Sequence, residues 1–228
     1  MGASSCPLVA QPARVVLGLV SRHVRAVMLL LSTACVYPAA ALGGSGPLGI
    51  DHEWSLDQRG IWSRGAQTSL EYGVLAVELG GALWMGNDDE TGHVFWQAVD
   101  STSISSAAAF ALKIGLSRAR PDQGGNANAW FKGKCCESFP SGEVTLQASF
   151  ITPFIAHYAA TNRWFWALEA LPLYDSIARV KSQAHWQTDV LAGWALGSAV
   201  GYWSAMRSTP LSVKILPHGV TVGISKRF

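Results

Sequence analysis

The sequence predicts an all-α protein, a helical bundle that ends in a short strand-like tail at residues 208–228. Apolar residues recur at helical spacing over several long stretches, and the alternation typical of strands is confined to the tail. Of the 228 residues, 49% are hydrophobic and only 14% are charged. That composition excludes a disordered chain, a coiled coil and a nucleic-acid binder with a basic face, so we expect no nucleic-acid partner.

The first 41 residues predict a secretory signal peptide. They carry three arginines and no acidic residue. Arg22 and Arg25 precede an apolar run at 26–36 and the small residues 39–41, the order of charge, apolar core and cleavage site that a signal peptide has. The run falls short of the ~20 apolar residues that cross a bilayer. We therefore expect cleavage after Ala41 and export to the periplasm or cell envelope, with a retained membrane anchor as the alternative.

One helical domain is expected over residues 66–207, after an irregular segment at 42–65 that is rich in Gly, Pro and Ser. Its helices are predicted over residues 68–85, 93–118, 141–160, 164–171, 173–180 and 185–206. Pro121 ends the second helix, because a residue before proline avoids the α conformation. In the tail, two alternating runs at 211–216 and 220–224 predict a β-hairpin.

Charged residues argue against membrane-spanning helices. Glu71 and Glu78 interrupt the first predicted helix and Asp100 interrupts the second. A charge at the middle of a bilayer costs at least ~2.5 kcal/mol. The stretch 189–206 is the best spanning candidate, although glycine and serine weaken it. We expect a periplasmic protein and leave membrane association open.

Two adjacent cysteines, Cys135 and Cys136, are those that an exported chain would keep. Neighbouring cysteines rarely bridge to each other because the geometry is strained, and their spacing matches no zinc site. We expect free or once-oxidised thiols, no metal and no cofactor.

Two clusters in the middle of the chain suit an anion. Lys113 and Arg120 stand seven positions apart, two helical turns, so both cations are expected on one face near a helix end. Residues 140–143, Pro-Ser-Gly-Glu, open a predicted helix whose free N–H groups form a ready anion site. Taken singly, the first cluster also fits cations that close a helix, and the second fits an ordinary capped helix.

A third cluster combines Arg179, His185 and Asp189. At positions i and i+4 of a helix, the histidine and the aspartate would share a face, so the carboxylate could hold one ring nitrogen and leave the other free. A surface pair is the alternative. Together the three clusters supply cations, a helix N-terminus and an oriented imidazole, which are the parts of a phosphoryl-transfer site that needs no metal.

The order Lys-x6-Arg-Pro, Pro-Ser-Gly and Arg-x5-His-x3-Asp over residues 113–189 resembles the three-part signature of the type-2 phosphatidic acid phosphatases, which the vanadium-dependent haloperoxidases share. The resemblance implies that His185 attacks phosphorus to form a phosphohistidine and that Asp189 orients the ring. It also implies a phosphate-binding set made of Lys113, Arg120, Ser141, Gly142 and Arg179.

Two positions depart from the family pattern. Ala178 stands where the family usually has serine, and Glu143 stands where the family has the histidine that protonates the leaving group. A glutamate takes that catalytic role only if its pKa is raised, and the nearby cations would lower it, so the direction stays open. A diphosphate leaves as a phosphate, whose second pKa is about 6. We therefore hypothesise that diphosphates are cleaved better than alkyl monoesters.

Three functions fit the sequence. The first is a metal-independent phosphatase of the cell envelope that acts on a lipid phosphate, a lipid diphosphate or a small phosphate ester. The second is a vanadate-dependent haloperoxidase, which is disfavoured because such enzymes are generally much longer and use the histidine that Glu143 replaces. The third is a non-catalytic phosphate-binding or scaffold protein that has lost the acid.

Overall fold

The computed structural model describes residues 45–87, 89–208, 211–216 and 219–224. All of them fall within one unit of the chain, residues 39–228. The predicted signal peptide, residues 1–41, lies outside the described residues.

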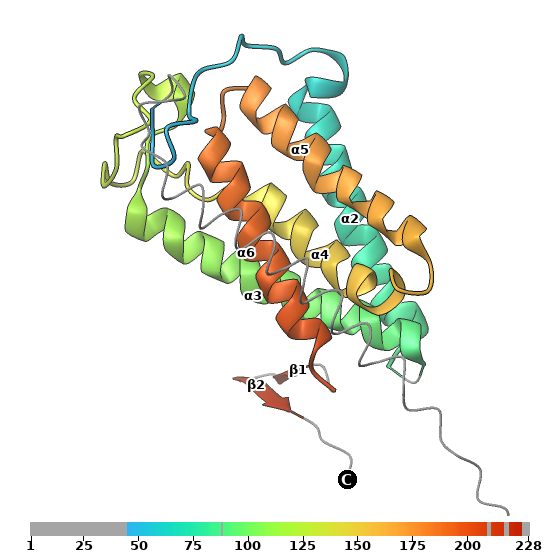
Figure 1. Cartoon of the computed structure of the whole chain (residues 1–228). Coiled ribbons are helices and arrows are strands. Elements are labelled where there is room, and N and C mark those ends of the chain that lie inside the picture. The colour runs from blue at the N-terminus through green and yellow to red at the C-terminus, as the bar shows by residue number, and fades with distance from the viewer. Residues whose placement is uncertain (1–44, 88, 209–210, 217–218, 225–228) are drawn as a thin grey trace, which may run out of the picture. The chain divides into compact units, whose positions relative to one another are not determined.

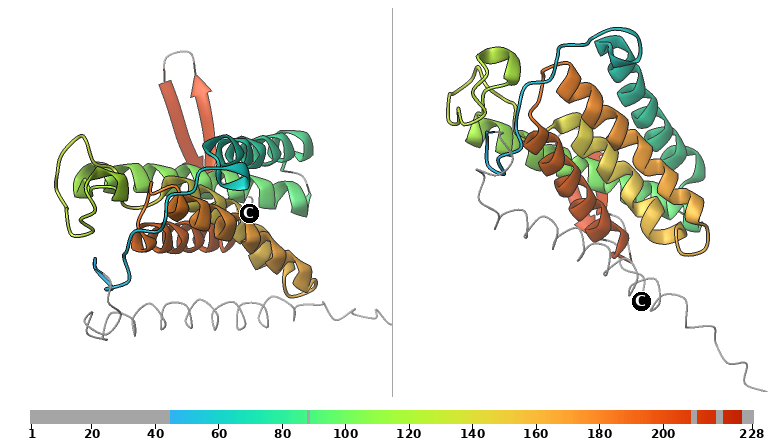
Figure 2. Two further views of the ribbon diagram at one scale, coloured as in Figure 1. Left: turned by 90° about the horizontal axis from the view of Figure 1, so that it is seen from above. Right: turned by 45° about the horizontal axis from the view of Figure 1, so that its top comes forward.

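Five α-helices form the described bundle. They are α2 (Arg64–Met85), α3 (Glu90–Leu116), α4 (Gly142–Tyr158), α5 (Ala170–Lys181) and α6 (Gln187–Ala205). The central helix is α4, which packs against α3, α5 and α6, while α3 packs in turn against α2 and α6 (Figure 1 and Figure 2). This architecture confirms the all-α bundle that the sequence predicts.

Short elements complete the described structure. They are the 3-10 turns η2 (Gly60–Trp62), η3 (Pro121–Gln123) and η4 (Arg163–Glu169), and the strands β1 (Leu211–Leu216) and β2 (Gly219–Ile224). β1 pairs antiparallel with β2. The predicted helix at 164–171 is in fact the turn η4, which runs directly into α5. Pro172 lies in the first turn of α5, where its missing N–H costs no hydrogen bond.

The main core lies between α2, α3 and α4. Its buried members are Val74, Val94, Ala98, Phe150, Ile151, Phe154 and Ile155. Phe95 meets Phe154 edge to face, with ring centroids 4.9 Å apart. Each large apolar side chain that is fully buried contributes about 1.5–3 kcal/mol, so this cluster fixes α3 against α4.

Three glycines bring α6 into direct backbone contact with α4. Gly193, Gly197 and Gly201 recur every four residues and therefore share one face of α6. A Cβ on Gly197 would lie 2.3 Å from the carbonyl oxygen of Thr145, and a Cβ on Gly193 would lie 2.5 Å from that of Ser141. No side chain fits at these contacts, so the first turns of α4 and α6 are held together.

α3 ends earlier than the sequence predicts. It stops at Leu116 because Ser117 takes a left-handed conformation with φ of 40°. Arg120 then stands at the N-terminus of η3. Arg120 therefore lies outside the helix, and the prediction that it shares a helix face with Lys113 is wrong.

The segment at 45–59 contains no helix and is held to the connection between α5 and α6. Asp57 N–H donates to the carbonyl of Lys181 at 3.0 Å. The side chain of Gln183 donates to the carbonyl of Trp54 at 2.8 Å. These bonds run along the stretch of chain that carries His185.

Residues 189–206, the best candidate for a membrane span by sequence, lie almost wholly within α6. Glycines and serines take up part of that helix. Neither α6 nor another described helix is both long enough and apolar enough to cross a membrane.

Gly197→Ala should destabilise the fold by ~1–3 kcal/mol, because the added methyl group would overlap the Thr145 carbonyl. Gly80→Ala is the matched control, since a Cβ at that position of α2 has no neighbour within 4 Å. Removing a helical glycine there should stabilise the protein by ~0.5–1 kcal/mol. Urea unfolding followed by circular dichroism measures both, and equal stability of the two variants would contradict the close helix contact.

Candidate active site

The three sequence motifs meet at one end of the bundle. Lys113 stands in the last turn of α3, Ser141 precedes α4, Arg179 stands in the last turn of α5, and His185 lies just before α6. A Cβ on Gly142 would lie 3.6 Å from Cε of Lys113, so the first two motifs are in contact.

His185 is buried, with one ring nitrogen bonded and the other available. Its Nδ1 lies 2.6 Å from the carbonyl oxygen of Ser138. Because a carbonyl only accepts, Nδ1 carries the proton and Nε2 has the lone pair. Burial lowers the pKa of His185 to about 3, with Arg179 and Lys113 acting in the same direction and Asp189 opposing them. The ring is therefore neutral near pH 7.

Asp189 organises the groups around the ring. Its Oδ2 lies 3.7 Å from Nδ1 of His185, beyond hydrogen-bond distance. Nδ1–H is instead hydrogen-bonded to the carbonyl of Ser138, which corrects the predicted hydrogen bond between His185 and Asp189 along one helix face. Oδ2 accepts from the hydroxyl of Ser138 and from Trp186 N–H, the latter at 2.8 Å. Burial would raise the pKa of Asp189, but His185, Arg118 and Ser138 outweigh burial and keep it below its usual range.

Arg118, which the motifs do not include, is a fully buried cation behind Asp189. All five of its N–H donors have acceptors. Nε and Nη2 both donate to the carbonyl of Ala127, at 3.0 and 2.6 Å. Nη1 donates to Oγ1 of Thr188 at 2.8 Å and to Oδ1 of Asp189 at 2.5 Å. Nη2 also donates to Oδ2 of Asp51 at 2.6 Å. With its donors used, Arg118 has none for a phosphoryl group. The motif selects Arg120, which Pro121 follows, and no sequence pattern marks Arg118.

Lys113 is held by the main chain and is easily deprotonated. Its Nζ donates to the carbonyl of Glu137 at 2.7 Å. Burial and the neighbouring charge of Arg120 lower its pKa to about 8. Lys113 is therefore mostly charged at pH 7 and loses that charge in mildly alkaline solution.

Two buried donors of the site have no partner. Ser141 stands at the start of α4 but its side chain makes no capping bond, and its Oγ is buried without a hydrogen bond. Arg179 donates from Nη1 to Gln67 at 3.0 Å, while its Nε is buried without a hydrogen bond. Buried polar groups are normally paired. Two unpaired donors beside a helix N-terminus therefore favour an anion site over an ordinary helix cap.

Glu143 is ion-paired at the edge of this site. Its Oε1 lies 2.6 Å from Nη1 of Arg64 and 3.3 Å from Nη1 of Arg179. Arg64, at the start of α2, was outside every predicted motif. Arg120 is half-buried and close enough for its charge to act on Lys113 and Arg179, so the structure gathers all three predicted cations.

Two further carboxyl groups lie near Glu143. Asp175 on α5 is buried, both of its oxygens lack hydrogen bonds, and burial together with Glu143 raises its pKa to about 7. The pKa of Glu71 on α2 is raised by the same two causes. Within the described residues, no group of three His, Cys, Asp or Glu side chains could hold a metal ion. Three carboxyl groups thus lie beside the cations, and burial favours the neutral form of Asp175 and Glu71.

A disulfide joins Cys135 to Cys136, which corrects the expectation that these neighbours do not bridge. It lies in the long loop between η3 and α4. The same loop continues into Glu137 and Ser138, whose carbonyls hold the lysine and the histidine of the site.

Anion binding should weaken as the pH rises through about 8, because Lys113 then loses its proton. Sulfate is a suitable probe, since its own charge is constant in this range. Titration calorimetry should show its dissociation constant rising about tenfold between about pH 7 and pH 9.5, the loss of one charged hydrogen bond. Lys113→Gln should remove the pH dependence and Lys132→Gln, on the exposed loop, should keep it. A flat profile for the unaltered protein would contradict this role.

The chain matches the family model described as PAP2 superfamily over residues 95–209, just over half of its length. A lipid A 1-phosphatase of Porphyromonas gingivalis is 30% identical over 95 residues, which are 40% of this chain and only 19% of that relative. The crystal structure of Aquifex aeolicus LpxE is 15% identical with a TM-score of 0.47, covering 64% of this chain and 87% of that one. The family match includes all three motifs, from Lys113 to Asp189, and this chain therefore belongs to the PAP2 superfamily.

Proposed function

We propose that this protein is a metal-independent phosphatase that hydrolyses a lipid phosphate, a lipid diphosphate or a small phosphate ester through a phosphohistidine. Membership in the PAP2 superfamily supports this, and so does the relative named lipid A 1-phosphatase, of which this chain matches about a fifth. One observation carries the proposal. His185 is buried and neutral. Its Nδ1–H is hydrogen-bonded to the carbonyl of Ser138, which leaves the lone pair of Nε2 available beside the cations.

The reaction has two steps. Nε2 of His185 attacks phosphorus while the bond from phosphorus to the leaving oxygen breaks. The ring becomes positively charged, because Nδ1 keeps its proton, which stays hydrogen-bonded to the carbonyl of Ser138. The carboxylate of Asp189, 3.7 Å from Nδ1, stabilises that charge. Water then attacks phosphorus, the nitrogen–phosphorus bond breaks, and inorganic phosphate leaves the neutral ring.

Cations and helix donors hold the phosphoryl group. The set is Lys113, Arg120, Arg179, the hydroxyl of Ser141 and the backbone N–H of Gly142. Binding an anion here pairs the two buried donors that otherwise have no acceptor, Ser141 Oγ and Arg179 Nε. Fixed donors aimed at the phosphoryl oxygens stabilise the charge that develops in the transition state.

Glu143 sets a limit on the leaving group. Its carboxylate is paired with Arg64 and Arg179, and an ion-paired carboxylate has no proton to donate. A phosphate leaving group needs protonation less than an alkoxide does. Diphosphates and activated esters are therefore the preferred substrates.

We place the protein in the cell envelope. Disulfides persist in oxidising compartments, so the bond between Cys135 and Cys136 supports export. The N-terminal signal-peptide pattern points to the same compartment. A lipid substrate would bring the active site to a membrane surface.

Phosphate release from an aryl monoester and from a lipid diphosphate should persist in excess EDTA and fall about 10³-fold or more in His185→Ala, which lacks the nucleophile. The matched control is His157→Ala, a half-buried histidine at the other end of α4 that bonds to Gln97 at 2.9 Å. Its turnover should be unchanged. If the unaltered protein binds phosphate but hydrolyses neither substrate, a non-catalytic binding protein is the better description.

Glu143→His should raise the turnover of an alkyl monoester by about 10²-fold, the effect of a general acid, and change the turnover of a diphosphate much less. Glu143→Gln is the control, because it removes the carboxylate without supplying an acid. The measurement is the turnover of the alkyl monoester and of the diphosphate by each variant. Equal gains in the two variants would trace the effect to release of Arg179 from its ion pair and would contradict the missing-acid explanation.

A further inference from the structure

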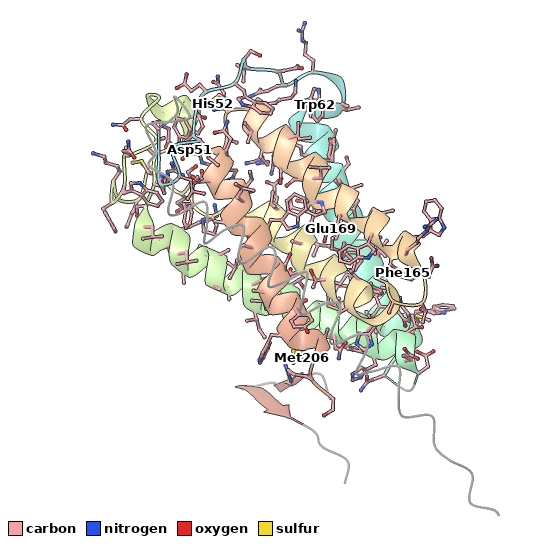
Figure 3. The ribbon with its side chains drawn as sticks, viewed as in Figure 1. Asp51, His52, Trp62, Phe165, Glu169 and Met206 are labelled. Atoms are coloured by element: carbon pink, nitrogen blue, oxygen red, sulfur yellow. A yellow bond between two sulfur atoms is a disulfide. The ribbon has the colours of Figure 1, made fainter. Side chains whose placement is uncertain are left out.

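A single buried carboxylate connects the irregular segment at 45–59 to the back of the active site. Asp51 is 1% exposed. Its Oδ1 accepts from Thr188 N–H at 2.8 Å, and its Oδ2 accepts from the Thr188 hydroxyl at 2.7 Å and from Arg118 at 2.6 Å. Figure 3 labels Asp51 at the end of the bundle where α6 begins. The carboxylate thus bonds to the residue just before Asp189 and to the cation behind it.

The backbone fixes Asp51 from both sides. Its N–H and carbonyl exchange hydrogen bonds with Ser45 at 2.9 and 2.8 Å. The next residue, His52, donates its N–H to the side chain of Gln187 at 3.0 Å and accepts from it at 2.9 Å. Residues 51 and 52 are therefore paired with the first two residues of α6, which lie between His185 and Asp189 in the chain.

Two carboxylates share the one guanidinium of Arg118 behind His185. Arg118 is bonded to Asp51 on one side and to Asp189 on the other, both at full burial. One guanidinium shared between two carboxylates leaves the trio with a net negative charge. If Asp189 alone faced Arg118, the guanidinium would neutralise it.

That remaining negative charge faces a ring surrounded by cations. Arg179 and Lys113 both disfavour positive charge on His185, and Asp189 is the group that favours it. The ring becomes positively charged when phosphorus bonds to Nε2. A neutralised Asp189 would no longer stabilise that charge.

We propose that Asp51 is a positioning residue of the active site, acting through Arg118 and Thr188 to hold Asp189 in place and negatively charged behind His185. The kinetic part of this inference rests on the proposed function. Asp51 bonds to none of the groups assigned to the phosphoryl oxygens. Its effect therefore falls on the reaction at the ring and leaves anion binding unchanged.

Asp51→Asn tests the proposal, because the amide keeps the shape and an acceptor for Thr188 N–H but removes the charge from Arg118. The kcat for an aryl monoester should fall about 10–100-fold, because a small misplacement of a catalytic group costs up to about 100-fold. KM and the dissociation constant of sulfate should change less than about twofold.

Glu78→Gln is the matched control. Glu78 is likewise 1% exposed, and its partner is the hydroxyl of Thr102 at 2.7 Å, between α2 and α3. The same carboxyl-to-amide change should leave kcat unaltered there. Equal losses of kcat in the two variants would reduce Asp51 to a contributor to folding and overturn the proposal.

Nitrogen-15 NMR of the histidine rings tests the positioning without turnover. In the unaltered protein, Nδ1 of His185 should be protonated and Nε2 should not. Asp51→Asn should loosen Asp189 from Ser138 and lower the population of this tautomer, whereas Glu78→Gln should keep it. A changed tautomer in a protein without phosphatase activity upholds Asp51 and rejects the proposed function. An unchanged tautomer together with unchanged kcat overturns the role of Asp51.

Thr188→Val serves if Asp51→Asn does not fold. It keeps the side-chain shape and both charges but removes the hydroxyl that donates to Asp51 and accepts from Arg118. A fall in kcat of about fivefold or more with unchanged sulfate binding is expected. Unchanged kcat in this variant would equally overturn the proposal.

Discussion

The direct contact between the backbones of α4 and α6 is the constraint on which the site depends. Glycines at 193, 197 and 201 place no side chain of α6 between the helices. As a result, Ser141 N–H donates to the carbonyl of Asp189 at 3.0 Å. The start of α4, with Ser141 and Gly142, is thereby fixed against the start of α6, which follows His185. A layer of side chains at this contact would move Ser141 and Gly142, at the start of α4, away from His185, just before α6.

The two buried arginines of the site, Arg118 and Arg179, differ in how many of their donors are hydrogen-bonded. Arg118 is saturated, since two carboxylates, a hydroxyl and a carbonyl use all of its donors. Arg179 is also buried but keeps its Nε without an acceptor. Breaking a buried charge pair costs about 3–5 kcal/mol, which makes Arg118 part of the framework. The unpaired Nε makes Arg179 suited to a ligand, because the ion pair with Glu143 is made by Nη1.

The sequence predicts what is periodic or local. Helical spacing of apolar residues predicts the bundle, and three short motifs predict which cations, hydroxyl and imidazole meet. Contacts that cross the chain escape this reasoning: Asp51 and Arg64 come from stretches without a pattern. The end of α3 escapes it too, because a serine rather than a glycine takes the left-handed conformation at 117. The partner of Nδ1 was missed because a main-chain carbonyl belongs to every residue and leaves no mark in the sequence.

The two acceptors that orient the lysine and the histidine are consecutive main-chain carbonyls, those of Glu137 and Ser138. Replacing the side chain at 137 leaves both carbonyls in place, so the amino-acid composition of this loop can drift while the two bonds persist. Adding or deleting one residue between the disulfide and Pro140 would move both carbonyls out of register together. Divergence of the chain must therefore preserve the length of this stretch as well as the hydroxyl of Ser138 that donates to Asp189.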